Sequence, residues 1–189
     1  SKNNKHDHII FTFNGKLRLI YNDVRKFGFI KFDYLKRLKT NIHLKFLGPE
    51  PLENIFNFNY FKRYIKGRNR IIKDLLMDQK FVSGLGNIYV NEILFYSKIK
   101  PTRKINKLKD FEIKAIIQNT KKVLKKAIKL GGSSIKDFTN STGKIGSFQQ
   151  HFNVYGMIGK ECPNPDCLCK IQKLVISNRG SFFCSKCQK

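Results

Sequence analysis

Four of the five cysteines have the spacing of ligands for one metal ion. Cys162 and Cys167 are separated by four residues, Cys184 and Cys187 by two, and sixteen residues lie between the pairs. Each pair can bring two thiolates to one ion, and the segment between them is long enough for a β-hairpin. The pattern predicts a zinc ribbon with one structural Zn²⁺ and no open coordination position. Cys169 is an alternative to Cys167, but it would lengthen the first spacing, so we expect it not to be a ligand.

Two further features have the chemistry to bind phosphate. Residues 78–89 predict a helix end, a turn containing Gly84 and Gly86, and a new helix that begins at Asn87. Glycines let the backbone approach a ligand, and the amides at a helix start attract anions. Lys73 on the preceding helix adds charge, although an ordinary helix–turn–helix corner is the alternative. Arg179 lies at the tip of the predicted zinc hairpin, where it would either contact phosphate or remain a solvated turn residue.

The charge balance indicates a polyanionic partner. The chain has 189 residues with 38 Lys+Arg against 13 Asp+Glu, a net charge of +25. Nucleic acid is the usual partner of such a field, with a ribosomal-type protein or an anionic membrane surface as alternatives. The 17 Phe and 7 Tyr argue against a wholly disordered chain. No apolar run approaches the ~18 residues that span a bilayer. The clustered cysteines indicate a reducing cytoplasm.

Strands are predicted first along the chain and helices after them. Residues 9–13 and 16–21 flank Asn14-Gly15, a strong hairpin signal, and residues 27–32 predict a third strand. Three strands make a poor independent unit, so we expect further sequence before Ser1. Residues 48–51 break regular structure, and residues 60–130 are predicted helical. Gly131-Gly132 ends the last helix, and polar residues 140–150 predict a loop.

Several sequence blocks together carry a family resemblance. In order, they are residues 5–8, 22–28, 47–52, 76–89, 131–138, 154–156 and 162–189. As a set, they resemble the formamidopyrimidine-DNA glycosylases (Fpg), from the end of that family's N-terminal domain to its C-terminus. The related endonuclease VIII enzymes share the helix–two-turn–helix module and the zinc hairpin. The block at residues 47–52 favours Fpg.

The resemblance implies an α+β fold with four parts. Residues 1–47 would be the end of an incomplete N-terminal β-sandwich domain and residues 48–59 a linker. Residues 60–150 would form a helix–two-turn–helix DNA-binding domain, and residues 151–189 a zinc-ribbon finger. The implied function is base-excision repair of oxidised purines (8-oxoguanine and formamidopyrimidines) by a bifunctional DNA glycosylase and AP lyase. The implied partner is double-stranded DNA containing a damaged base, bound by a monomer associated with the bacterial nucleoid in the cytoplasm.

The resemblance also assigns roles to individual positions. Asn87 would contact the phosphate beside the lesion, with Lys73 and Arg179 on the same strand. Arg179 would also be a catalytic proton donor in δ-elimination. Arg25 and Phe27 would fill the void and wedge the stack when the damaged base leaves the duplex, since a glycosylase must extrude its target.

Three further assignments follow from the same resemblance. His6 and Arg25 match DNA-contacting positions, and residues 142–148 match a loop that closes over the flipped base. Asn69 stands where the family usually has a basic phosphate-contacting residue, and Arg68 and Arg70 flank it as possible substitutes.

One departure concerns the nucleophile. The family uses an N-terminal Pro amine, followed by Glu, with a Lys on a later loop; this sequence begins Ser1-Lys2-Asn3. We therefore expect the 189 residues to bind damaged DNA and zinc but to lack the nucleophile. The alternatives are a non-enzymatic zinc-ribbon nucleic-acid-binding protein and an endonuclease VIII-like glycosylase.

Overall fold

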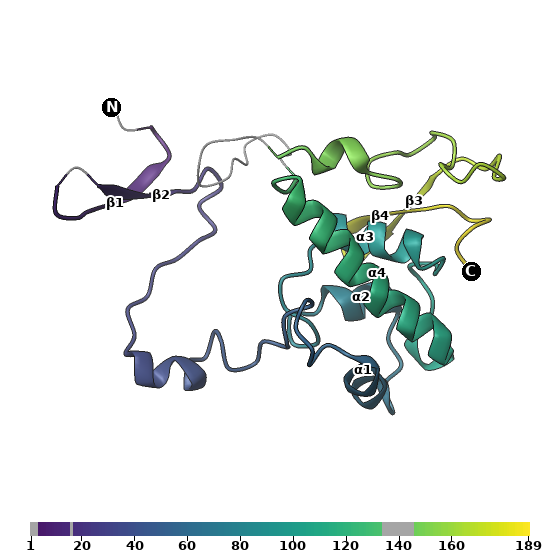
Figure 1. Cartoon of the computed structure of the whole chain (residues 1–189), viewed down its shortest axis with the longest axis horizontal. Helices are drawn as coiled ribbons and strands as arrows, with labels where there is room; N and C mark the ends of the chain where they lie inside the picture. The colour runs from purple at the N-terminus through teal and green to yellow at the C-terminus, as the bar shows by residue number, and fades with distance from the viewer. Residues whose placement is uncertain (1–3, 16, 134–145) are drawn as a thin grey trace. The chain divides into compact units, whose positions relative to one another are not determined.

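The computed structural model describes residues 4–15, 17–133 and 146–189 of the chain (Figure 1). The chain divides into two compact units, Ser1–Thr40 and Asn41–Lys189. None of the helices in these described ranges combines the length and the apolar character that a membrane crossing requires. The finer division of the second unit into linker, helical domain and finger stays a prediction.

The first unit contains one β-hairpin. Strands β1 (Asp7–Thr12) and β2 (Arg18–Asn22) pair antiparallel, with Ile10 opposite Ile20. Gly15 in the connecting turn has φ +86°, a conformation that glycine adopts without strain. The predicted hairpin is therefore confirmed. A short 3₁₀ helix, η1 (Leu35–Thr40), follows later in the unit.

The prediction of a third strand at residues 27–32 is wrong. These residues form no strand, and Phe27 is 82% exposed. A strand needs a hydrogen-bonded neighbour, and in the described part of the chain β1 and β2 pair only with each other. The apolar side chains of this segment therefore fit the pattern of a strand but find no ladder to join.

The second unit packs four α-helices around a common core. They are α1 (Phe58–Ile65), α2 (Ile72–Met77), α3 (Asn87–Tyr96) and α4 (Asp110–Lys129), with 3₁₀ turns η2 (Ile105–Lys107) and η3 (Phe148–His151). Helix α3 is central, because it contacts α2, α4 and the second strand of the C-terminal hairpin. That hairpin consists of β3 (Gln172–Ile176) and β4 (Arg179–Phe183).

Helix α4 shows how the sequence specifies both a helix and its C-terminal end. Ile113, Ile116, Val123 and Ala127 recur at helical spacing and are buried against the core. The Gly132 amide then donates to the Ala127 carbonyl (2.8 Å), at φ +83°. The helix and its glycine stop, both predicted, are confirmed.

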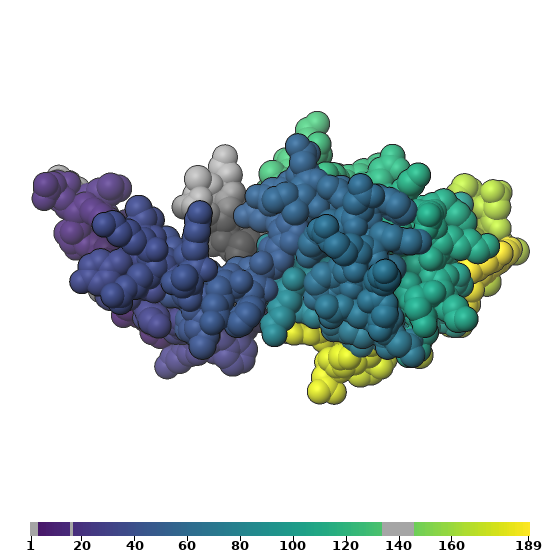
Figure 2. All heavy atoms as spheres, turned by 90° about the horizontal axis from the view of Figure 1, so that it is seen from below, coloured from purple at the N-terminus to yellow at the C-terminus, as the bar shows by residue number. Residues whose placement is uncertain are grey.

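Helix α3 and the segment that follows it anchor the cysteine-bearing part of the unit. The buried Glu92 carboxylate accepts from the backbone amides of Asn153 (2.9 Å), Val154 (3.0 Å) and Tyr155 (2.9 Å). At the C-terminus, the Gln188 side chain donates to the Ile99 carbonyl (2.9 Å). Figure 2 shows the C-terminal residues in yellow against the helical part of this unit. The hairpin is thus held by α3 on one side and by the segment that follows α3 on the other.

Candidate metal centre and nucleic-acid interface

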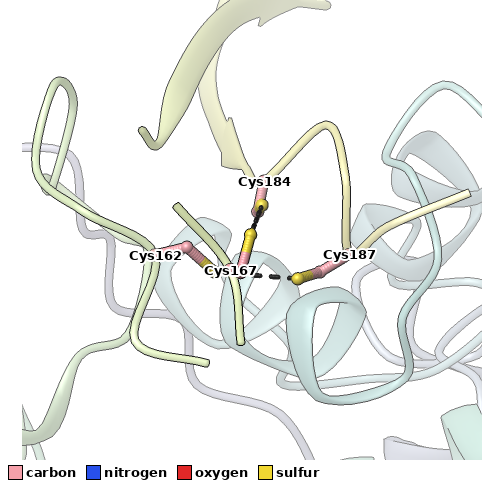
Figure 3. Close-up of side chains that lie close together, drawn as sticks. All are labelled: Cys162, Cys167, Cys184 and Cys187. Atoms are coloured by element: carbon pink, nitrogen blue, oxygen red, sulfur yellow. Dashed lines mark hydrogen bonds between the residues drawn. The ribbon is translucent and has the colours of Figure 1, made fainter. Parts of the chain in front are cut away.

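The four predicted cysteine ligands converge on one point. All four Sγ atoms lie within 4.8 Å of one another, and Figure 3 shows the four side chains pointing toward one another. Two of them come from the segment before β3 and two from the segment after β4. The sulfur atoms of Cys162 and Cys187 are 3.7 Å apart, and those of Cys167 and Cys184 are 3.6 Å apart. A tetrahedral zinc with Zn–S bonds of about 2.3 Å needs sulfur–sulfur edges of about 3.8 Å. The donor set therefore fits Zn²⁺.

Hydrogen bonds and charge around the sulfurs agree with a cation site. The Asn164 side-chain amide donates to the Cys187 sulfur (3.0 Å). A hydrogen bond from the Cys169 backbone amide lowers the pKa of the Cys167 thiol, whereas burial raises the pKa of Cys162. Four thiolates this close repel one another, so the fully deprotonated cluster requires a cation at its centre. Cys169 lies outside the cluster of four.

A second constellation joins α2, α3 and the hairpin. The Gly180 carbonyl accepts from Lys73 Nζ (2.9 Å) and from Asn87 Nδ2 (3.1 Å). Arg179 is the residue before this acceptor and its side chain is exposed. The structure therefore brings Lys73 and Asn87, which belong to one predicted feature, to the backbone beside Arg179, which belongs to another.

Lys73 is the buried member of this constellation. Its side chain is only 1% exposed, and its ammonium also donates to the Ser181 hydroxyl. Burial lowers the pKa of Lys73 to about 8; Asp74 opposes this shift and the charge of Arg179 adds to it. Lys73 thus lies beneath the hairpin, while Arg179 lies on its outer surface.

The glycine turn before α3 is organised by Gln79. Its side-chain oxygen accepts from the Gly84 amide (2.7 Å), and its side-chain nitrogen donates to the Leu85 carbonyl (3.0 Å). Gly84 has φ +82°, and Gly86 is the N-cap residue of α3, where no side chain caps the helix. Asn87 is therefore the first residue of α3, as the sequence predicted.

Asn91 is a member of the site that the sequence analysis missed. It is fully buried one turn after Asn87, donates to the Asn87 carbonyl (2.7 Å) and accepts from the Phe182 amide (2.6 Å). The sequence did contain a signal for Asn91, because a polar side chain within an apolar helix requires a specific hydrogen-bond partner. Its partner strand, however, lies about 90 residues further on.

In the first unit, Asp23 organises the loop that carries Arg25 and Phe27. Its carboxylate accepts from the backbone amides of Arg25 (3.1 Å) and Gly28 (2.8 Å) and from the Tyr21 hydroxyl (3.0 Å). These hydrogen bonds lower the pKa of Asp23 to about 2, and the bond from the Gly28 amide has the largest effect. The Arg25 guanidinium lies 5.8 Å from the centroid of the exposed Phe27 ring. Phe27 is therefore presented at the surface of its unit.

The remaining predicted positions are more dispersed. The half-buried His6 lies beside the same loop, and its carbonyl accepts from the Asp23 amide (3.1 Å). Asn69 is exposed between α1 and α2. Its neighbour Arg70 pairs with Asp78 (2.7 Å), whereas Arg68 lies over the Tyr64 ring.

Residues 142–148 are only partly covered by the structure. Residues 142–145 of this predicted loop lie outside the described residues. Phe148 is buried in the helical core, where its ring packs against Tyr89 at 5.7 Å between centroids.

Comparisons with known proteins place this architecture. A family model described as the formamidopyrimidine-DNA glycosylase H2TH domain matches residues 47–139. The formamidopyrimidine-DNA glycosylase of Listeria monocytogenes is 42% identical over 185 residues, covering 98% of this chain and 67% of the relative. This chain belongs to the formamidopyrimidine-DNA glycosylase family. The corresponding enzyme of Roseobacter denitrificans is 41% identical over 187 residues, of which 98% of this chain and 65% of the relative are covered. The chain thus spans about 65% of that relative's length.

Solved structures of the family agree with the fold. The complex between Lactococcus lactis Fpg and DNA containing an abasic site has a TM-score of 0.90 and 37% identity, covering 100% of this chain and 68% of the other. A complex of MutM with DNA containing carbocyclic 8-oxo-G has a TM-score of 0.89 and 37% identity, with the same coverage. The Fpg fold, with its mixed helices and small sheets, is consistent with the expected α+β class. The roles of the individual site residues stay predictions.

Proposed function

We propose that this chain grips duplex DNA at a damaged base in base-excision repair. The observation that supports it most directly is the shared acceptor at Gly180, whose carbonyl ties Asn87 and Lys73 to the backbone beside Arg179. Side-chain amides and guanidinium groups are good phosphate ligands, and a single clamp formed from both would hold neighbouring phosphates of one strand. Lys73 adds positive charge from beneath the β3–β4 hairpin.

The other unit supplies the wedge in this proposal. Extruding a nucleotide costs a few kcal/mol of stacking and pairing, and side chains that enter the gap offset part of that cost. Phe27 and Arg25 are exposed on a loop held by Asp23, which suits them for this task. His6, beside the loop, and Asn69 would also contact the DNA.

The chemistry proposed for the complete enzyme is excision of oxidised purines, including 8-oxoguanine and formamidopyrimidines, followed by AP-lyase strand nicking. Arg179 would act as the proton donor in δ-elimination. The 189 residues would bind the lesion without removing the base. Zinc held by the four cysteines would stabilise the finger and take no part in the reaction. A monomeric state and a cytoplasmic, nucleoid-associated location remain predictions.

Binding and trapping experiments test this proposal. The chain should bind an 8-oxoguanine duplex more tightly than an undamaged duplex, with an affinity that falls steeply with salt as counterions are released. Borohydride should trap no covalent adduct between these 189 residues and the 8-oxoguanine duplex, and an adduct would contradict the proposal that they bind the lesion without removing the base. Preference for oxidised pyrimidines would indicate endonuclease VIII-like selectivity, and preference for RNA would indicate a non-enzymatic binding module.

A further inference from the structure

A second contact fixes the hairpin to α2, at the turn that precedes Arg179. The Ser177 hydroxyl donates to Asp74 Oδ1 at 2.8 Å. Ser177 and Asn178 form the turn with φ of +48° and +60°. This left-handed region is well tolerated by asparagine and less so by serine, so the turn gains from external support.

Arg179 is consequently held from both sides. On one side, Ser177 bonds to Asp74; on the other, Gly180 bonds to Lys73, the neighbouring residue of α2. Arg179 itself pairs with Ile176 as the last pair of the β3–β4 ladder. A long side chain on a fixed backbone loses less freedom when it meets its ligand, because its anchor point is already in place.

We propose that Asp74 is a positioning residue that sets Arg179 for phosphate through its hydrogen bond to Ser177. The proposal rests on the proposed function, in which Arg179 contacts DNA. The direction in which DNA affinity changes when Asp74 is replaced tests the proposal. A carboxylate beside a phosphate-binding surface repels DNA, so a role of charge alone predicts tighter binding when it is removed. A positioning role predicts weaker binding.

The experiment measures DNA binding by fluorescence anisotropy with the 189-residue chain and a duplex containing a tetrahydrofuran abasic analogue. Asp74→Ala and Ser177→Ala should each weaken binding about threefold to tenfold, the range expected for one lost hydrogen bond. Asp74→Asn is the matched control, since it keeps the acceptor oxygen and removes the charge, and it should bind at least as tightly as the parent. Parental or tighter binding by Asp74→Ala and Ser177→Ala overturns the proposal.

A double-mutant cycle separates positioning from a general structural effect. In an Arg179→Ala background, Ser177→Ala should cost less than about twofold, because the contact acts through Arg179. A full, independent cost in that background overturns the proposal. The Arg179 Nε–H signal in ¹H–¹⁵N spectra should move in Asp74→Ala and be retained in Asp74→Asn, while the thermal midpoint stays within a few degrees.

The cycle also distinguishes failure of the positioning role from failure of the proposed function. If Arg179→Ala weakens binding and Ser177→Ala does not, only the positioning role of Asp74 is lost. If Arg179→Ala leaves binding unchanged, the phosphate contact assigned to Arg179 and the positioning role both fail.

Discussion

Lys73 on α2 and Asn87 on α3 donate to the same atom, the carbonyl oxygen of Gly180. Two helices and a strand therefore meet at one acceptor, and one of the two bonds is charge-assisted, which makes it the stronger kind. The hairpin cannot shift along the helices without breaking both bonds. The helical part of the unit thus determines where the backbone of Arg179 lies.

Asn87→Ala should weaken DNA binding about tenfold while leaving zinc content and stability close to the parent. The substitution removes the proposed phosphate ligand and one of two donors to the Gly180 carbonyl, whereas Lys73 remains as the other donor. Anisotropy titrations and metal analysis measure the two effects. Asn119→Ala is the matched control, because Asn119 bonds to Ser97 on another part of the unit. Loss of zinc in Asn87→Ala would contradict the phosphate role.

DNA affinity should fall as pH rises through about 8, because the buried Lys73 ammonium loses its proton there rather than near 10.5. The effect on folding has the opposite sign. Between these pH values the unfolded chain binds the proton and the native chain does not, so stability from this group rises with pH. Side-chain NMR of Lys73 measures the midpoint, and Lys73→Met should abolish the step in affinity. A midpoint near 10.5 would refute the prediction.

The sequence predicted local features of the fold better than it predicted which segments meet. The cysteine spacing, the Asn14-Gly15 hairpin and the amphipathic pattern of α4 are each specified within a short stretch, and the structure contains all three. The junction of Lys73 with Gly180 joins residues 107 apart, and no short-range pattern encodes it. The strand prediction for residues 27–32 was wrong for the same reason. Apolar content suggests a strand, but it does not show whether a neighbouring strand is available for pairing.

Asp23→Asn should loosen the loop that presents Arg25 and Phe27 and weaken DNA binding. An amide offers one acceptor oxygen where the carboxylate uses two. Because the pKa of Asp23 is lowered to about 2, its stabilising effect is complete above its unfolded value of 3.8 and disappears as pH falls through about 2. Amide shifts of Arg25 and Gly28 report both effects. Asp33→Asn, in the same unit, should leave these shifts unchanged.

Glu92→Gln should destabilise the second unit by about 2–4 kcal/mol and release residues 153–155 from α3. The buried carboxylate accepts three backbone amides, and a glutamine NH₂ would face one of those donors without an acceptor. Urea unfolding measures the loss, and hydrogen exchange locates it. The exposed Glu161 provides the control, since Glu161→Gln should change stability by less than about 0.5 kcal/mol. Equal effects at the two positions would contradict the anchoring role.

Chelation of zinc should unfold the finger while α1 to α4 persist. The buried core around the hairpin contains Cys162, Cys167 and Cys184 beside a few apolar side chains, whereas the helical core is a separate and larger cluster. We therefore expect the smaller core to depend on a bound metal for its stability. After chelation, helical circular dichroism should be retained and DNA affinity lost. Cys167→Ala should lower zinc content and Cys169→Ala should not; metal loss in the latter variant would move the ligand assignment to Cys169.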